Sequence, residues 1–403
     1  CGTTGATIRY TVNGQDPILI DPAIGEGETL LVSGSVTLKA RAWKDGMDAS
    51  AVATAEYRIT GEVAAGGYHA LGLQSGGVVS SWGRDDAGQL GRSGLLDVPE
   101  AVPGMTNGLN VAAGLKHSLA LLDDGTIWAW GTNSYGQLGD DTFTRRTAPV
   151  QVVGLTGAVQ IAAGENFSMA LMADGTVRAW GDNAAGQLGD GTTNKSKVPI
   201  SVPGISNAVE IAAGRSHSLV LLEDGTVRAA GQNTWGQLGD GSTNNQWSPV
   251  AVTNLTNVVQ IAAGSYFSAA LDGAGQLYCW GSGTNGGLGM GDTANRLIPT
   301  AVPGMSNIVT VATTKRQFGY AIDAVGQLWG WGENAMWQMG DGGTTNRLAP
   351  GLIPLPGGAA VAAGGYHAGY AALLDGSLWA WGEGSYGEIG DGASADRTVP
   401  VLV

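Results

Sequence analysis

The sequence predicts an all-β fold, in which a seven-bladed β-propeller at residues 61–403 follows a small immunoglobulin-like β-sandwich module at residues 1–60. Three observations support this prediction. One phrase recurs seven times, each copy contains four short runs with the alternation of a β-strand, and glycine holds fixed places in every copy. A single four-stranded sheet cannot bury both of its faces, so the repeats must stack against one another.

The repeat has a regular length. Its copies open at Val63, Val111, Ile161, Ile211, Ile261, Val311 and Val361, with a first interval of 48 residues and five intervals of 50. In the third copy we expect strands at 159–164, 168–172, 176–180 and 199–202. An Asp-Gly pair, such as Asp174-Gly175, separates the second strand from the third and predicts a two-residue type I′ hairpin turn.

The residue types suit a ring of blades. Ala-Ala-Gly in the first strand fits the crowded inner end of a blade. A large aromatic residue in the third strand fills the wider space between blades, at Trp82, Trp130, Trp180, Trp280, Trp331 and Trp381, with Ala230 in the remaining copy. The sequence leaves open whether packing or a shared strand closes the ring.

The repeated phrase carries a family resemblance. Ile-Ala-Ala-Gly-x-x-His-Ser, Asp-Gly-Thr-Val-x-Ala-Trp-Gly and Asn-x-x-Gly-Gln-Leu-Gly-Asp-Gly together resemble the regulator of chromosome condensation repeat family over residues 61–403. This resemblance implies a seven-bladed propeller that binds proteins through loops on one face. The family's members range from a nuclear exchange factor to bacterial secreted proteins, including a β-lactamase inhibitor protein.

The amino-terminal segment carries a second resemblance. The runs 8–17, 38–46 and 53–57, with a hairpin expected at Asn13-Gly14, are similar to the chitobiase/β-hexosaminidase carboxy-terminal domain family. That resemblance implies an immunoglobulin-like module of secreted or cell-surface bacterial proteins, which would serve as a spacer or in carbohydrate contact. The family usually has a strand before the position of Cys1, so we expect the chain to be part of a longer protein.

Composition narrows the classes of partner. The net charge is −14 and the pI near 4.6, so the surface repels the phosphate backbone, and we expect no nucleic-acid partner. No apolar run approaches the roughly 18 residues of a membrane span. Cys279 takes a slot filled by alanine in other copies, which indicates a buried packing residue.

The candidates for catalysis are weak, and we expect no enzyme. His69, His117, His217 and His367 align in one slot of the repeat, where other copies have Phe167, Phe267 and Gln317. A slot that accepts phenylalanine serves packing, and each histidine belongs to a different blade, so no catalytic triad can be assembled. No cofactor motif is present.

The Gly-Asp-Gly loops allow two interpretations. They occur at Gly189, Gly239, Gly340 and Gly390. Aspartate and asparagine are ordinary residues of tight turns, where their side chains bond to the backbone. Carboxylate and amide oxygens in a Gly-rich loop also suit calcium, although the spacing is not that of an EF-hand.

Positions that differ between copies are the predicted partner-binding residues. Two residues between the Gly and His slots should form a ring around one mouth of the axis, and from these we select Tyr68, Lys116, Glu165, Arg215, Tyr266, Lys315, Arg316 and Tyr366. Aromatic residues outside the tryptophan ladder form a second set: Tyr135, Trp235, Trp337 and Tyr386 after the third strand, and Trp247 in a longer loop. Local loop packing is the alternative role of these aromatics.

Blade six departs most from the repeat. Residues 311–318 lack the Ala-Ala-Gly phrase, and Trp337 replaces a loop glycine that is present at Gly136, Gly186, Gly236 and Gly387. Sequence drift and a specialised binding surface would explain this loss of the consensus equally well.

The first functional hypothesis is therefore a non-enzymatic extracellular or cell-surface scaffold whose loops contact a protein partner or copies of itself, in a surface layer or fibre. Carbohydrate binding through Trp235, Trp247 and Trp337 is the alternative. Nucleotide exchange on a small GTPase is a third hypothesis, by analogy with the nuclear family member.

Overall fold

The computed structural model describes residues 6–11, 16–19, 21–24, 36–44, 46–57, 62–74 and 76–403. The chain divides into two compact units, Cys1–Thr60 and Gly61–Val403. Among the described residues, no helix is long and apolar enough to cross a membrane.

The described part of the first unit is one antiparallel sheet. Its strands are β1 (Thr7–Thr11), β2 (Ala23–Ile24), β3 (Val36–Trp43) and β4 (Ala53–Tyr57), in the order β2-β1-β3-β4. Ile8 lies opposite Ala42 and Lys39 opposite Thr54, which fixes the register of β3 between its neighbours. The hairpin expected at Asn13-Gly14 lies outside the described residues.

The second unit contains seven four-stranded antiparallel sheets in chain order, here called sheets 1 to 7. Sheet 1 contains β5 (Glu62–Ala65), β6 (His69–Leu73), β7 (Val79–Gly83) and β8 (Glu100–Ala101), and sheet 2 contains β9 (Gly108–Ala113), β10 (His117–Leu122), β11 (Ile127–Gly131) and β12 (Arg146–Gln151). Sheet 3 contains β13 (Ala158–Ala163), β14 (Phe167–Met172), β15 (Val177–Gly181) and β16 (Ser196–Ser201), and sheet 4 contains β17 (Ala208–Ala213), β18 (His217–Leu222), β19 (Val227–Gly231) and β20 (Gln246–Ala251).

The later sheets follow the same order. Sheet 5 contains β21 (Val258–Ala263), β22 (Phe267–Asp272), β23 (Leu277–Gly281) and β24 (Arg296–Ala301), with the short 3-10 helix η1 (Thr284–Gly286) before its last strand. Sheet 6 contains β25 (Ile308–Thr313), β26 (Phe318–Asp323), β27 (Leu328–Gly332) and β28 (Arg347–Leu352), and sheet 7 contains β29 (Ala359–Gly364), β30 (Ala368–Leu373), β31 (Leu378–Gly382) and β32 (Arg397–Leu402). Each of the seven repeats expected from the sequence thus forms one sheet.

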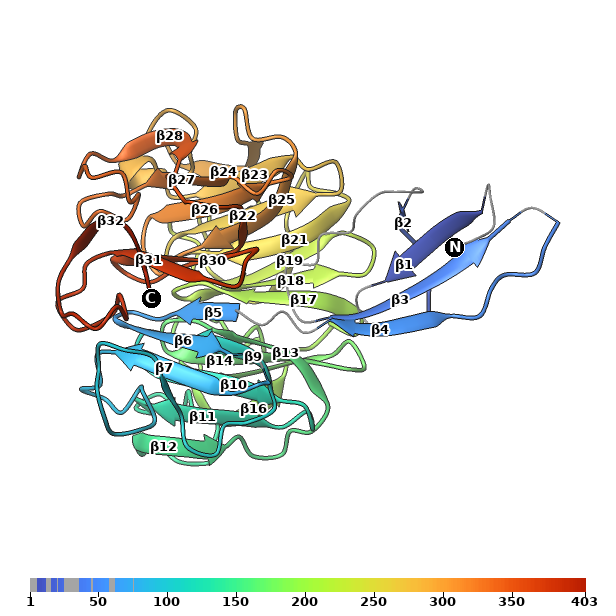
Figure 1. Ribbon diagram of the computed structural model, residues 1–403. Coiled ribbons are helices and arrows are strands. Elements are labelled where there is room, and N and C mark those ends of the chain that lie inside the picture. Colours follow the sequence, from blue (N-terminus) through green and yellow to red (C-terminus); the bar gives the residue numbers. More distant parts are fainter. Residues whose placement is uncertain are drawn as a thin grey trace. The chain divides into compact units, whose positions relative to one another are not determined.

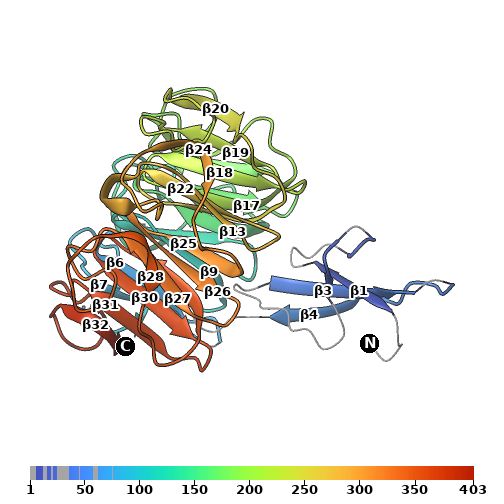
Figure 2. The same ribbon diagram turned by 90° about the horizontal axis from the view of Figure 1, so that it is seen from above.

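The sheets stand around a common centre, with the first strand of each innermost (Figure 1, Figure 2). Each first strand contacts the first strand of the next sheet, and β29 of sheet 7 contacts β5 of sheet 1. This cyclic order of four-stranded sheets is that of a β-propeller. Among the described residues, sheets 1 and 7 share no strand, so packing closes the ring.

The tryptophan ladder forms the core between the sheets, as expected. Trp82, Trp130, Trp180, Trp280, Trp331 and Trp381 are at most 1% exposed. Each indole N–H donates to a backbone carbonyl of the preceding sheet: Trp130 bonds to Gln89 O at 2.8 Å and Trp180 to Gln137 O at 2.9 Å. Trp82 closes the cycle with a bond to Glu388 O at 2.8 Å. Cys279 is fully buried in the same core, and burial raises the pKa of its thiol.

The predicted type I′ hairpin turn is wrong. Gly125 has φ of 74°, but Asp124 is not in the left-handed region. Gly125 N–H donates to Leu122 O at 3.0 Å and Leu122 N–H donates to Thr126 O at 3.0 Å, which is a three-residue loop with a single left-handed glycine. The Asp124 carboxylate accepts the Thr126 N–H at 2.9 Å, so the aspartate stabilises the turn through its side chain.

The constant period of 50 residues is also wrong at sheet 6. Ala263 pairs with Ser268 in sheet 5, whereas the equivalent Thr313 pairs with Gly319 in sheet 6, so the connecting loop has one extra residue. The histidine slot of the last two copies therefore holds Phe318 and Ala368, and not Gln317 and His367. The seventh copy opens at Ala362, and not at Val361, by the same register.

Candidate functional site

Both predicted sets of binding residues lie on one face of the ring. Strands alternate in direction, so the loop between the first and second strands and the loop between the third and fourth strands emerge on the same side. Backbone bonds join the two loops: Thr132 N–H donates to Lys116 O, and Arg84 N–H to Tyr68 O, both at 2.8 Å. We call this side the rim face.

The first loops of the sheets bond to one another around the axis. Leu115 N–H donates to Glu165 O at 3.0 Å, Glu165 N–H to Arg215 O at 3.3 Å, and Arg215 N–H to Gly264 O at 3.2 Å. Tyr366 N–H donates to Gly67 O at 3.2 Å and so links sheet 7 to sheet 1. We call this set of bonds the girdle. It holds the variable rim residues in fixed positions relative to one another.

Sheet 6 joins the girdle differently because its loop is longer. The Ser265 hydroxyl donates to Lys315 O in place of a backbone N–H, and Thr314 forms a parallel bridge with Gly364 of sheet 7. The Lys315 side chain then crosses the axis, and its Nζ donates to Ala163 O of sheet 3 at 2.6 Å. Burial lowers the pKa of Lys315 to about 8. The predicted rim residue Lys315 therefore links sheet 6 to sheet 3 across the axis.

Charged side chains of sheets 3, 4 and 5 are also paired on the rim face. Arg215 forms an ion pair with Glu165, hydrogen-bonds to the Tyr266 hydroxyl and places its guanidinium 5.1 Å from the Tyr266 ring centroid. These three predicted residues come from sheets 3, 4 and 5. The predicted Lys116 pairs with Asp86 at 2.8 Å, which joins sheets 2 and 1.

An aromatic cluster lies where sheets 7 and 1 meet. The Tyr68 ring has edge-to-face contacts with Tyr366 at 5.5 Å and with Tyr386 at 5.8 Å. Arg84 lies over Tyr386 at 4.6 Å, and Arg316 lies over Tyr366 at 5.7 Å and pairs with Glu333. The structure thus brings Tyr68, Tyr366 and Tyr386, which were predicted as members of two separate sets, into one cluster. We call it the seam cluster.

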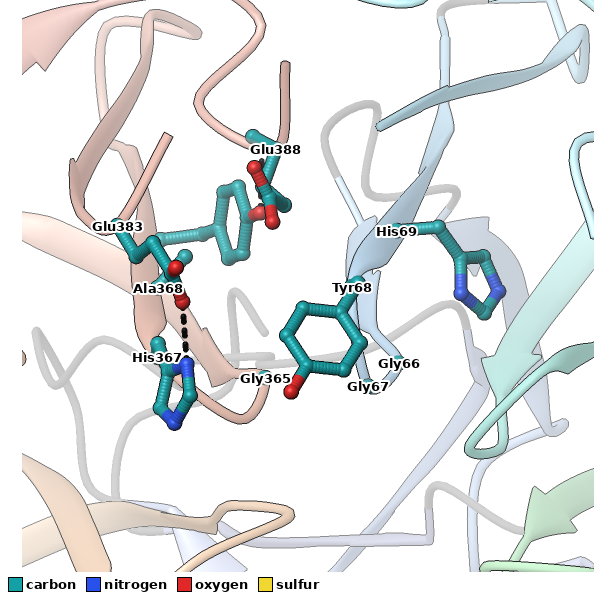
Figure 3. A pocket seen from close by; sticks show the side chains of 10 residues that line it. Gly66, Gly67, Tyr68, His69, Gly365, His367, Ala368, Glu383 and Glu388 are labelled. Atoms are coloured by element: carbon teal, nitrogen blue, oxygen red, sulfur yellow. Dashed lines mark hydrogen bonds and ion pairs between the residues drawn. The ribbon is translucent and has the colours of Figure 1, made fainter. Parts of the chain in front are cut away.

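A small cavity lies beneath this cluster. Its walls include Tyr68 from sheet 1 and Gly365, His367, Glu383 and Glu388 from sheet 7. Figure 3 shows the sheet 7 side chains on one side of the space and Tyr68 on the other, with His367 Nδ1 hydrogen-bonded to Glu383. Burial raises the pKa of Glu388 to about 7, and nearby Glu383 adds to this rise.

The remaining predicted aromatics lie apart from the seam cluster. Tyr135, Trp235 and Trp247 are about half exposed, at 40%, 39% and 54%. The sequence analysis expected Trp247 in a loop, but it lies in the outer strand β20. Its Cα packs against Gly186 of sheet 3. Trp337 has φ of 58°, as the loop glycine it replaces would, and is partly buried. Among the described residues, no ring contact joins Trp235, Trp247 and Trp337.

Three histidines have a role in construction. His69, His117 and His217 are at most 1% exposed, and each Nε2 lies 2.9–3.1 Å from the hydroxyl of a serine in the next sheet. The serine donates to a backbone carbonyl, as Ser118 does to Gln89 O at 2.8 Å, so the imidazole is the donor to the serine. Burial lowers the pKa of His69 to about 3, which keeps the ring neutral.

The Gly-Asp-Gly loops are internally bonded. In the equivalent loop of sheet 2, which reads Gly-Asp-Asp, Asp140 Oδ1 accepts the Thr142 N–H at 3.1 Å and the Asn133 amide at 2.9 Å, and Asp140 Oδ2 pairs with Arg146. The same backbone bond recurs at Asp190, Asp240, Asp341 and Asp391. Within the described residues, no group of three or more acidic, histidine or cysteine side chains is arranged to hold a metal ion. Calcium binding in these loops stays an untested hypothesis.

Sequence reasoning missed His367, Arg84 and Glu388. Glu388 could have been found, because its position holds glutamine in five other copies: Gln89, Gln137, Gln187, Gln237 and Gln338. His367 was assigned to the packing slot because a fixed period hides the extra residue of sheet 6. A broader groove of about 540 Å³ between sheets 1 and 2, lined by Arg92, Met105 and Trp128, also gave no signal in the sequence.

Comparison with known families identifies the repeat. The RCC1-like domain family matches residues 34–369, and the regulator of chromosome condensation (RCC1) repeat matches residues 375–403. The chain belongs to the RCC1-like domain family. The comparison with curated proteins gives no match.

Solved structures show the same fold. The chain is similar to Prp20p from Saccharomyces cerevisiae, whose structure was described with its binding properties to Gsp1p and histones, at 25% identity and a TM-score of 0.73, over 81% of this chain and 85% of that one. It is also similar to yeast RCC1 (Prp20) bound to Kap60, at 24% identity and a TM-score of 0.72, over 81% and 83% of the two chains. Human WBSCR16 is 22% identical, with a TM-score of 0.70, over 89% of this chain and 97% of that one.

Proposed function

We propose that the chain is a non-enzymatic, extracellular or cell-surface scaffold in which a seven-bladed propeller binds a protein partner through its rim face. The observation that carries this proposal is the girdle: it fixes loops of different composition from all seven sheets on one face. Fixed loops bind with little loss of conformational freedom, which favours protein recognition. The binding of Gsp1p and histones by the similar Prp20p supports a protein partner.

The seam cluster is the proposed centre of the contact. Tyr386 is 43% exposed, and its neighbours Tyr68 and Arg84 hold it in place. Tyrosine and arginine are the residue types that dominate protein interfaces. The partner is a different protein or another copy of this chain, assembled as a surface layer or fibre. The amino-terminal unit, as an immunoglobulin-like and chitobiase-like module, would act as a spacer.

A photo-crosslinking amino acid tests this proposal. We would place it at Tyr386 on the rim face and, as a matched control of similar exposure, at Val159, at the end of strand β13 that lies away from the rim face. A partner that crosslinks from position 386 and not from position 159 supports the rim face. Crosslinking only from position 159 would contradict it. A solution mass above the 40.8 kDa of the chain would identify the partner as a second copy.

Two other functions have specific support. Carbohydrate binding is favoured by the exposure of Trp235 and Trp247, and a glycan array with Trp235→Ala and Trp247→Ala as controls tests it. Nucleotide exchange is favoured by the likeness to Prp20p, which binds Gsp1p, and release of a fluorescent nucleotide from a small GTPase tests it.

A further inference from the structure

The cavity between sheets 1 and 7 has a buried carboxylate in its wall. Glu388 is 3% exposed, and its Oε1 has no hydrogen-bond partner among the described residues. Its Oε2 accepts the Tyr386 N–H at 2.8 Å. A buried carboxylate oxygen without a donor is costly, so a group that donates hydrogen bonds is expected beside it.

The other copies of the repeat show what has changed at this position. Gln137 and Gln237 use Oε1 for the same bond, to Tyr135 N–H at 3.0 Å and Trp235 N–H at 2.9 Å. Their second atom, Nε2, is a donor, and it too is buried without a hydrogen-bond partner among the described residues. In Glu388 that place is held by an oxygen, which is an acceptor. The substitution therefore inverts the hydrogen-bonding character of one site in the ring and leaves the local backbone contact intact.

The other walls of the cavity add a second carboxylate and an aromatic ring to Glu388. Glu383 borders the same cavity and accepts hydrogen bonds from His367 and from Ser385, the latter at 3.0 Å (Figure 3). The Tyr68 ring forms the opposite wall, and such a ring attracts cations, as the Arg84 guanidinium 5.4 Å from its centroid shows. The cavity leaves about 10 Å³ for the centre of a water-sized molecule, which is room for one small group.

We propose that this cavity binds an ammonium group, either the free ion or the terminal group of a lysine from a binding partner. An ammonium group is close to water in size, offers several N–H donors and neutralises the charge that a water molecule would leave. It would donate to Glu388 Oε1 and lie between the two carboxylates and Tyr68. The proposal is independent of the proposed function, because the free ion needs no partner protein.

Thermal unfolding in matched chloride salts tests the proposal. At equal ionic strength, ammonium should raise the Tm of the native chain by about 2 °C relative to tetramethylammonium, which is too large to enter. Glu388→Gln should abolish this difference and keep its Tm in tetramethylammonium, because glutamine occupies the position in five other copies. An equal ammonium effect in both proteins, or none in the native chain, overturns the proposal.

Nuclear magnetic resonance gives a second readout. A bound ¹⁵N-ammonium ion should give a proton resonance in the native chain that is absent in Glu388→Gln. Butylammonium carries the terminal group of a lysine: its displacement of this resonance would identify a site open to lysine, and its failure to do so would identify an enclosed site for the free ion. If Glu388→Gln does not fold, Glu383→Gln removes the second carboxylate and takes its place. Absence of any bound resonance contradicts the proposal.

Discussion

Sheets 2 to 5 and the arc of sheets 6, 7 and 1 build the same contact between neighbours from different residues. In the regular part, the Gln137 carbonyl accepts both the Trp180 indole and the Ser168 hydroxyl of the next sheet. At the seam, the Glu388 carbonyl accepts the Trp82 indole and the Tyr370 hydroxyl of its own sheet. Ala70 stands where the serine would be, so the tyrosine supplies the missing hydroxyl.

Sheets 6 and 7 show the same exchange. The Tyr320 hydroxyl donates to Gln338 O, and Gly369 occupies the serine slot of the next sheet. A Cβ at Gly369 would lie 2.3 Å from the Tyr320 hydroxyl, so only glycine leaves room for it. The comparison teaches that a carbonyl bonded to the tryptophan indole occurs in both regions, and that the residue supplying the hydroxyl is free to change. Four predictions test how far the two regions are equivalent.

Trp82→Ala should have the largest effect. Removing a buried tryptophan that bonds across the seam should lower the free energy of unfolding by about 4 kcal/mol, since a cavity remains and one hydrogen bond between the sheets is lost. Trp180→Ala is the matched variant in the regular part. Urea unfolding should give similar losses for both. A much smaller loss for Trp82→Ala would show that the seam does not need its tryptophan.

Glu210→Gln should change how stability depends on pH. Glu210 Oε2 accepts the Ile261 N–H at 3.0 Å, as Gln160 and Gln260 do at their equivalent positions, and burial raises the pKa of Glu210 to about 8. The native state then keeps a proton that the unfolded chain loses above its ordinary pKa of 4.5, so the contribution of Glu210 to stability should fall as the pH rises from 4.5 to 8.

The glutamine variant should match the native chain near pH 4.5 and exceed its free energy of unfolding by about 2 kcal/mol above pH 8. Urea titrations across this pH range measure the difference. Gln160→Glu, the reciprocal variant, should gain the same dependence. Parallel pH curves for the native chain and Glu210→Gln would show that the carboxylate is not desolvated.

Gly136→Ala should have an intermediate effect. A Cβ at Gly136, where φ is 86°, would lie 2.5 Å from the Lys197 Cα of the next sheet, so strain and a backbone clash should together cost about 2 kcal/mol. Gly154 also has positive φ, at 69°, but nothing within 4 Å, and Gly154→Ala should cost only about 1 kcal/mol. Equal losses in thermal or urea unfolding would mean that the loop does not press on its neighbour.

The smallest effect is expected at the seam cluster. A double-mutant cycle of Arg84→Ala and Tyr386→Ala should give a coupling of about 0.5–1 kcal/mol, because the guanidinium lies 4.6 Å from an exposed ring. Lys195 and Phe143, also 4.6 Å apart, provide the equivalent pair in the regular part. Zero coupling at the seam would show that the cluster is not preformed for binding.

The candidate site was only partly predictable. Comparing copies located the variable residues, and their place on one face follows from strand direction alone. The meeting of Tyr68 with Tyr386 could not be predicted, since the two residues are separated by nearly the whole propeller sequence and meet only because the ring closes. The axis-crossing Lys315 and the position of His367 both depend on one extra loop residue, which a fixed repeat length conceals.

The sequence by itself determined the repeated sheet, its strand order and its buried tryptophans, because a period of alternating residues specifies local pairing and a stacking face. Only the tertiary structure decided how the ring closes, which rim side chains pair, and that Glu388 borders a cavity with an unpartnered oxygen. These features arise where the first and last sheets meet. No pattern within a single copy describes that junction, because its energy comes from contacts between residues far apart in the chain.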